Sequence, residues 1–344
     1  MIVLAKEKGV LKFMLRRLSL ACLISLFCLN LQAKTPIKFA VIAPEGSTWM
    51  VMMHEFDKEI QRDSKGELEF KLFPGGVSGD EIDVIRKMKM NKINSAGFTG
   101  VGLGQILPQV RVLELPMMFS SYEEVDYVTE RLQPHFEKEF EKNGYVLLGW
   151  AEVGFVNIFS NKKIDSMKAM EGVKMWAWEG DPLVKTMFEI MKVVPNPLAI
   201  TDVFTSLQTG LIDAVYISPL GAIAMQWFSK TKYMTDVKLT DATGAVLMEK
   251  KFFDKLTPAN QTLLKTKFKA FCKKLITSSR KENEIAYATL KKNNIETVKF
   301  TDTVKLEEIS KKAWDALIGK LYPKTLLDEV IKHKNDFRKL SKKA

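Results

Sequence analysis

The sequence predicts an α/β protein built from two lobes, on the basis of two observations. Strand-like segments alternate with helical patterns of about a dozen residues in both halves of the chain, which indicates βαβ units and parallel sheets. After a hydrophobic N-terminal segment roughly 310 residues remain, more than one core usually holds, and 46% of the sequence is hydrophobic. We therefore expect two lobes with a cleft between them.

The clearest alternation lies between Gly172 and Pro219. Strands are predicted at 174–178, 193–197 and 211–217, with a helix in each interval. Asp181 is a favoured N-cap residue followed by Pro182, and Gly210 suits the position just after a helix that opens at Thr201. Ligands of such sheets bind beyond the carboxyl ends of the strands, so side chains near 176–178 and 216–218 are expected to meet a ligand.

The first half of the chain repeats this alternation. A strand at 37–42 leads into a helix capped by Ser47 or Thr48, and apolar residues recur at helical spacing to Ile60. A strand at 67–73, a helix at 79–91 and a strand at 93–98 follow. Glycines at 100, 102 and 104 do not have the G-x-G-x-x-G spacing of a nucleotide site, so we interpret them as positions of close packing.

The remaining elements connect the lobes. We expect a strand and an apolar turn at 113–119, a long helix at 121–143, and strands at 145–152 and 156–160 that enter the second lobe. A strand at 244–249 returns, and a helix from Thr257 to about Asn293 spans both lobes. These elements assign residues 34–155, together with about 245–275, to lobe I. They assign residues 156–244, together with about 276–344, to lobe II.

The first 33 residues are interpreted as a secretory signal peptide. Arg16 and Arg17 precede an apolar run that ends near Ala33, a small residue suited to a cleavage site. A retained membrane helix is the alternative, but the run is short for a bilayer. Lipidation at Cys22 is less favoured than cleavage after Ala33, because almost no hydrophobic region would precede it. The predicted location is the periplasm.

Charge and catalytic residue types exclude several functions. The formal net charge is +11, of which residues 1–33 carry +4, and the later lysines are interspersed with acids as on solvated helices. The sequence has no concentrated patch of basic and aromatic residues, which nucleic-acid binding would require. The three histidines, His54, His135 and His333, are scattered along the chain. We therefore expect that the protein binds no metal ion or cofactor and is not an enzyme. An exported hydrolase is the alternative of another class, but no nucleophile lies beside a base.

Three segments carry a resemblance to a known family. They are the 172–219 segment with its LQTGLIDA motif at 207–214, the FPGGVSGDEIDVIRKMKMN segment at 73–91, and LELPMMF at 113–119. Together they resemble the substrate-binding subunit of tripartite ATP-independent periplasmic (TRAP) transporters. The resemblance implies a two-lobed periplasmic binding protein fold with a long helix spanning both lobes, which closes around a small molecule and delivers it to a TRAP membrane permease.

Two departures from the family pattern bear on the ligand. Most members have an arginine at the third place of the 174–178 strand, which grips a ligand carboxylate as a bidentate fork, and here Trp176 stands there. The family often has asparagine where this chain has Ser218. We therefore predict a hydrophobic or amphipathic ligand. The alternative is an organic acid held by another cation, for which Lys174 is the candidate.

The predicted ligand-binding residues come from both lobes: Ser47, Trp49, Phe98, Thr99, Met117, Phe119, Phe155, Trp176, Trp178, Tyr216 and Ser218. The 43–49 segment and the tryptophan strand also resemble the branch of the family that works with a tetratricopeptide-repeat lipoprotein. The resemblance therefore implies such a lipoprotein as a second partner beside the permease.

Overall fold

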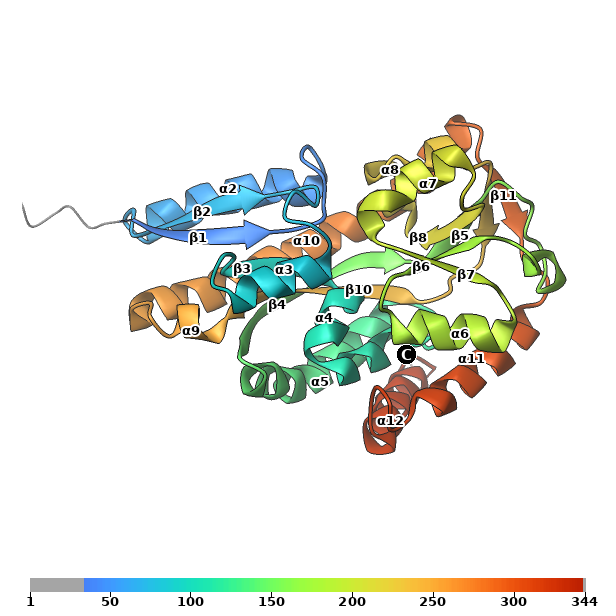
Figure 1. Ribbon diagram of the computed structural model, residues 1–344. Helices are drawn as coiled ribbons and strands as arrows, with labels where there is room; N and C mark the ends of the chain where they lie inside the picture. Colours follow the sequence, from blue (N-terminus) through green and yellow to red (C-terminus); the bar gives the residue numbers. More distant parts are fainter. Residues whose placement is uncertain (1–33, 343–344) are drawn as a thin grey trace, which may run out of the picture.

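The computed structural model describes residues 34–342 and contains two lobes, each built on one sheet (Figure 1). The first sheet has the strand order β2-β1-β3-β10-β4, and the second has the order β11-β9-β5-β8-β6-β7. Helices lie on the faces of both sheets. The predicted two-lobed α/β class is therefore confirmed, whereas the predicted signal peptide at 1–33 lies outside the described residues.

Lobe I contains the first sheet. Its strands are β1 (Thr35–Ala40), β2 (Leu68–Phe73), β3 (Ser95–Thr99), β4 (Tyr145–Phe155) and β10 (Asp241–Glu249). Its helices are α2 (Thr48–Asp63), α3 (Glu81–Lys89), α4 (Gly100–Ile106), η2 (Pro108–Glu114), α5 (Tyr122–Lys142) and α9 (Lys250–Phe253). Ser47 caps α2 by accepting a hydrogen bond from the Met50 N–H, and the helix buries Met53, Phe56 and Ile60.

Lobe II contains the second sheet. Its strands are β5 (Asn157–Ser160), β6 (Met175–Trp178), β7 (Pro195–Leu198), β8 (Ala214–Ile217), β9 (Tyr233–Asp236) and β11 (Glu296–Lys299). Its helices are η3 (Lys168–Met170), α6 (Pro182–Met191), η4 (Ile200–Asp202), α7 (Val203–Thr209), α8 (Pro219–Ala224), η5 (Trp227–Lys230) and α11 (Thr303–Leu317). The predicted start of α6 and end of α7 hold, since Asp181 caps α6 and Gly210 takes a left-handed conformation after α7, whereas α7 begins at Val203 rather than at Thr201.

Both sheets are mixed rather than wholly parallel as predicted. β1 pairs in parallel with β2 and β3, but β10 runs antiparallel to β3 and β4. Similarly, β6 is parallel to β7 and β8, whereas β5 is antiparallel to β8 and β9. The reason is topological: β4–β5 and β9–β10 carry the chain between the lobes, so a strand that returns from one lobe enters the other sheet in the opposite direction.

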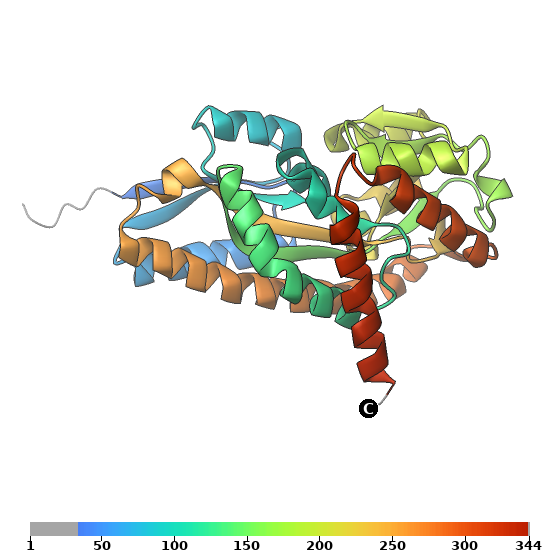
Figure 2. The ribbon, with the colours of Figure 1, turned by 90° about the horizontal axis from the view of Figure 1, so that it is seen from below.

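The predicted long helix is confirmed as α10 (Pro258–Lys292), a helix of 35 residues capped by Thr257. At 1.5 Å per residue it is roughly 50 Å long. Its first half buries Leu264, Phe268 and Leu275 in the core of lobe I, and Leu290 near its end packs in the core of lobe II. Figure 2 shows α10, in orange, running lengthwise along the lower side of the view.

The last helix, α12 (Lys324–Ser341), corrects one part of the predicted lobe division. Residues 276–344 are predicted in lobe II, yet α12 packs against α5 of lobe I. The Arg338 guanidinium donates to Glu124 on α5 at 3.1 Å, and the rings of Phe337 and Tyr127 lie 5.4 Å apart. The helix therefore crosses back over the first lobe, as its position in Figure 2 shows.

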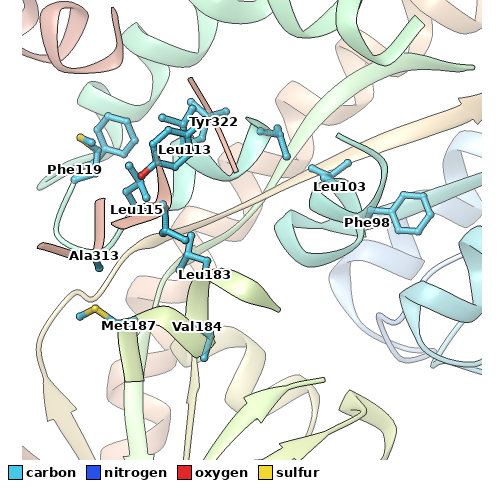
Figure 3. Packing of buried hydrophobic residues seen from close by; sticks show 14 of the residues in the cluster. Phe98, Leu103, Leu113, Leu115, Phe119, Leu183, Val184, Met187, Ala313 and Tyr322 are labelled. Atoms are coloured by element: carbon cyan, nitrogen blue, oxygen red, sulfur yellow. The ribbon is translucent and has the colours of Figure 1, made fainter. Parts of the chain in front are cut away.

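Of the strand and apolar turn predicted at 113–119, the turn is present at 116–117, but the strand is wrong. Residues 108–114 form η2 instead, and Met117 has a left-handed φ of 57°. The helical turn brings Arg111 beside Glu114, three residues later, and an extended strand would separate this buried ion pair. Leu113 and Phe119 turn into the core beside Tyr322 of the C-terminal region (Figure 3).

Candidate functional site

A cavity of about 590 Å³ lies between the two lobes. Lobe I lines it with residues 41–49 and 97–101, together with Arg111 and Glu114. Lobe II lines it with residues of β6, with one side of α6 from Leu183 to Met191, and with residues between 216 and 227. A volume of this size is typical of small-molecule sites, and pockets between lobes are their usual place.

Eight of the eleven residues that the sequence predicts as ligand-binding line this cavity. They are Ser47, Trp49, Phe98, Thr99, Trp176, Trp178, Tyr216 and Ser218. The fold therefore brings together segments that are more than a hundred residues apart in the chain. Their contact with a ligand stays a prediction.

The other three, Met117, Phe119 and Phe155, do not line the cavity and are corrections. Phe119 is buried in a core cluster with Leu113 and Leu115 (Figure 3), and Met117 packs against the same cluster. The Phe155 ring instead packs on Tyr122, with 4.8 Å between ring centroids. Because the 113–119 segment is not a strand, its side chains do not alternate toward the cleft.

Lys174, the cation of the organic-acid alternative, also lies outside the cavity lining. It precedes β6, is exposed, and its Nζ donates to the Gly210 carbonyl at 3.2 Å. The strand alternation that would place it beside Trp176 does not hold, because β6 begins only at Met175. A ligand carboxylate inside the cavity would therefore not meet this ammonium group.

Trp176 forms the centre of an aromatic wall on the lobe II side. Its ring stacks on Tyr216 with a centroid distance of 4.9 Å and an interplanar angle of 20°, and Trp227 meets it edge-on at 5.2 Å. The indole N–H donates to the Leu198 carbonyl at 3.0 Å, which fixes the ring. Trp176 is only 2% exposed and is at once part of the lobe core and of the cavity wall. At this position the cavity presents apolar surface.

Trp178 connects the two lobes. Its indole N–H donates to both carboxylate oxygens of Asp80, the residue that caps α3 in lobe I, at 3.0 and 3.1 Å. The Asp80 carboxylate also accepts from the backbone N–H of Ile200 in lobe II at 3.1 Å. One buried carboxylate therefore accepts from two N–H groups across the cleft, and the lobes are in a closed arrangement.

A buried ion cluster that was not predicted from the sequence lies at the cavity and is formed by Arg111, Glu114 and Asp181. The Arg111 Nη1 lies 3.0 Å from Glu114, and its Nη2 lies 2.9 Å from Asp181 in the opposite lobe. Asp181 was interpreted only as a helix cap. One feature of the sequence does indicate part of this cluster. Arg111 and Glu114 lie three residues apart inside the apolar segment 110–119, which favours a buried ion pair over a solvated one.

Burial changes the ionisation of carboxyl groups at the cavity. It raises the pKa of Glu114 to about 7, although the neighbouring Arg111 charge opposes the rise. It also raises the pKa of Glu81 to about 8, even though Glu81 accepts hydrogen bonds from Thr99 and from the Gly102 N–H. Both groups are therefore largely or partly protonated near neutral pH, and the site carries less negative charge than its sequence suggests.

The hydroxyl groups at the cavity already have structural roles. Ser47 Oγ donates to the Pro44 carbonyl at 2.6 Å and caps α2, and Ser218 Oγ accepts from the Gly221 N–H at 3.1 Å to cap α8. Within residues 34–342, no group of histidine, cysteine or acidic side chains is arranged to hold a metal ion, and no helix is long and apolar enough to cross a membrane.

The chain matches a family model described as "DctP: Bacterial extracellular solute-binding protein, family 7" over residues 39–323. Among curated proteins, it is 27% identical over 244 residues to an uncharacterized Haemophilus influenzae protein, covering 67% of this chain and 71% of that protein. It is 19% identical over 296 residues to the C4-dicarboxylate-binding protein DctB of Bacillus subtilis, covering 86% of this chain and 82% of that protein.

Solved structures show the same fold. The sugar acid binding protein DctPAm of Advenella mimigardefordensis, in complex with galactonate, superposes with a TM-score of 0.82 at 20% identity, covering 88% of this chain and 98% of that chain. A TRAP periplasmic solute binding protein of Xanthobacter autotrophicus, with bound β-D-galacturonate, superposes with a TM-score of 0.81 at 17% identity. The match covers 87% of this chain and 99% of that chain. The chain belongs to the DctP family of bacterial extracellular solute-binding proteins, the TRAP subunits that bind a solute rather than convert it.

Proposed function

We propose that this TRAP solute-binding protein captures a hydrophobic or amphipathic small molecule in its interlobe cavity and delivers it to the permease. The observation that carries the proposal is Trp176, which stands where the family resemblance implies a carboxylate-gripping arginine. Its ring and those of Tyr216 and Trp227 form an apolar wall in place of a positive charge.

The charges of the cavity support the same ligand class. Among the lining residues that the structure describes, Arg111 is the only cation, and it is already paired with Glu114 and Asp181. Burying a ligand carboxylate without a free cation costs several kcal/mol. The galactonate and galacturonate in the two solved relatives are acids, so this chain is proposed to differ from them in ligand class.

Mass spectrometry of the protein purified without unfolding, followed by calorimetric titration, tests this proposal. We expect alkyl compounds such as 1-octanol and 1-decanol to bind, with affinity rising about fourfold for each added methylene, because each buried CH₂ contributes about 0.8 kcal/mol. Galactonate, galacturonate and succinate are expected to bind weakly. Tight binding of one of these acids with no binding of the alkyl series would overturn the proposal.

Two variants sharpen this test. Trp176→Arg replaces apolar surface by a charge and is expected to lower decanol affinity at least about tenfold, which corresponds to 1.4 kcal/mol. Lys174→Ala is the matched control on the same segment, since Lys174 is exposed and outside the cavity lining. Loss of acid binding in Lys174→Ala, with decanol binding unaffected by Trp176→Arg, would favour the organic-acid alternative instead.

We also propose export by the 1–33 segment and, beside the permease, a tetratricopeptide-repeat lipoprotein as partner. TRAP solute-binding proteins are periplasmic and work with membrane permease subunits. Several lysines on the exposed side of α12, Lys324, Lys332 and Lys339, offer a charged face to a helical-repeat protein. Recovery of the permease without any repeat protein, on purification from native membranes, would count against this partner.

A further inference from the structure

Within residues 34–342, the single arginine that lines the cavity is neutralised from the opposite lobe. Arg111 belongs to lobe I, and Asp181 follows β6 in lobe II by three residues. Their 2.9 Å contact is buried, with side-chain exposures of 5% and 2%. Beside it, the Gln105 amide donates to the Gly180 carbonyl at 3.0 Å, so the whole turn between β6 and α6 is held against lobe I.

Both oxygens of the Asp181 carboxylate are occupied. Oδ1 accepts from the Leu183 N–H at 2.9 Å and so caps α6, while Oδ2 accepts from Arg111 Nη2. On the arginine, Nη1 faces Glu114 at 3.0 Å. The guanidinium therefore has a carboxylate on each of its two terminal nitrogens, which is the arrangement a bound organic acid would otherwise complete.

A ligand carboxylate would face two unfavourable options at this cluster. It could displace Asp181, which would leave a buried charge without its partner, or it could become a third carboxyl group around one guanidinium. Burial already raises the pKa of Glu114 to about 7, so the cluster resists even the negative charges it holds. Neither option exists for a ligand whose polar end is uncharged.

Two residues that line the cavity carry buried N–H groups without a partner among residues 34–342. Arg111 Nε and Trp49 Nε1 have no acceptor among the described residues, and both side chains line the cavity. Each buried donor left unpaired costs about 1–3 kcal/mol, and a hydroxyl, ether or ester oxygen is the kind of group that satisfies such a donor without adding charge. The unsatisfied groups at this site are thus donors that lack an oxygen acceptor.

We propose that Asp181 acts as a built-in substitute for a ligand carboxylate on Arg111, and that it restricts the cavity to uncharged amphipathic molecules, such as a long-chain alcohol or a monoacyl glycerol. This inference rests on the proposed function because it concerns the same cavity, and it names the chemical class of the ligand's polar end. Asp181 is then a specificity-determining residue.

The test compares decanol with decanoate, which share their chain length and differ in charge. The wild-type protein is expected to bind decanol at least about tenfold more tightly than decanoate, a difference of 1.4 kcal/mol. Asp181→Ser removes the charge but keeps an N-cap hydroxyl for α6. In this variant the ratio of decanoate to decanol affinity is expected to rise about tenfold or more, because Arg111 gains a free position.

Two further variants control the result. Arg111→Met combined with Asp181→Ser is expected to abolish the gained decanoate binding. Asp202→Ser makes the same substitution at the N-cap of α7, on an exposed residue that does not line the cavity, and is expected to leave the ratio unchanged. Asp181→Asn, which also preserves a capping side chain, replaces Asp181→Ser if the serine variant does not fold.

The outcomes separate this inference from the proposed function. If wild-type protein binds decanoate as tightly as decanol, or if folded Asp181→Ser and Asp181→Asn gain no preference for decanoate, the role of Asp181 is wrong while an apolar cavity still stands. If neither decanol nor decanoate binds, the proposed function fails and this inference fails with it.

Discussion

Arg111, which is buried, and Arg280, which is half-buried, each hold two carboxylates, and they join different parts of the molecule. Arg111 pairs with Asp181 across the cleft, so this contact must break whenever the lobes separate. Arg280 on α10 pairs with Glu152 on β4 and Asp126 on α5, both in lobe I, at 2.6 Å each. The second cluster stabilises the lobe in any arrangement, whereas the first stabilises only the closed one. The same chemistry therefore supports folding at one site and closure at the other.

The largest expected effect is on folding. Arg280→Met leaves Glu152, whose side chain is 4% exposed, without its cation, and we expect a loss of about 3 kcal/mol in the free energy of unfolding. Urea unfolding measures this loss. Lys274→Met on the same helix is the control, because its 4.0 Å contact with Glu55 is exposed on both sides and should contribute less than about 0.5 kcal/mol. Equal losses in both variants would contradict the comparison.

Arg111→Met tests the other cluster. Opening the lobes lets the unpaired Asp181 reach water, so we expect a smaller loss of unfolding free energy, about 2 kcal/mol, together with a shift toward the open form. Small-angle scattering should show a larger radius of gyration for this variant than for the wild type. An unchanged radius in Arg111→Met, or an increase of the same size in Arg280→Met, would show that the two clusters do not differ in this way.

Asp80→Asn weakens closure without leaving an unpaired cation. The asparagine retains a capping oxygen for α3, but it lacks the charge that binds the Trp178 indole and the Ile200 N–H. A charged hydrogen bond contributes more than a neutral one, so we expect a loss of about 1.4 kcal/mol, or about tenfold in decanol affinity. Calorimetry measures it, with Asp83→Asn on the exposed side of α3 as control. An equal loss in the control would remove Asp80 from the closure contacts.

The smallest expected effect is a pH dependence of stability. The folded pKa of Glu81 is about 8 and that of Glu114 about 7, against an ordinary value of 4.5, because both are buried. The folded state therefore binds more protons between these values, and this contribution to stability is present below pH 4.5 and lost as the pH rises through 7 and 8. Between pH 6.5 and 7.0 we expect the free energy of unfolding to fall by about 1 kcal/mol.

Glu81→Gln checks the origin of that slope, since glutamine does not titrate. Urea unfolding at the two pH values should show a decline less than half as large in the variant as in the wild type. A slope that is the same in both proteins would mean that Glu81 is not the group that takes up the proton.

The local signals in the sequence predicted much of the fold. Asp181 with Pro182, Gly210, and Thr257 with Pro258 marked helix ends that the structure confirms, because capping depends on neighbouring residues alone. The position of Trp176 at the cavity followed from the strand in which it lies.

What could not be predicted depended on contacts between distant segments. The 113–119 segment looked like a strand because it is apolar, but its conformation is decided by the Arg111–Glu114 pair and by packing against Tyr322. Similarly, the partner of Arg111 lies 70 residues away in another lobe, so no sequence spacing indicates it. The position of α12 on lobe I depends in the same way on Arg338 and Glu124.

The contact between Trp178 and Asp80 has an optical consequence. The Trp178 indole is 7% exposed and is held by a carboxylate of the opposite lobe, so separation of the lobes would transfer this chromophore from a protein interior to water. Its emission would then shift to longer wavelength, whereas Trp150, packed on Phe136 within lobe I and outside the cavity lining, would report no such change. The chain thus carries its own fluorescent reporter of closure, with a reference signal in the same molecule.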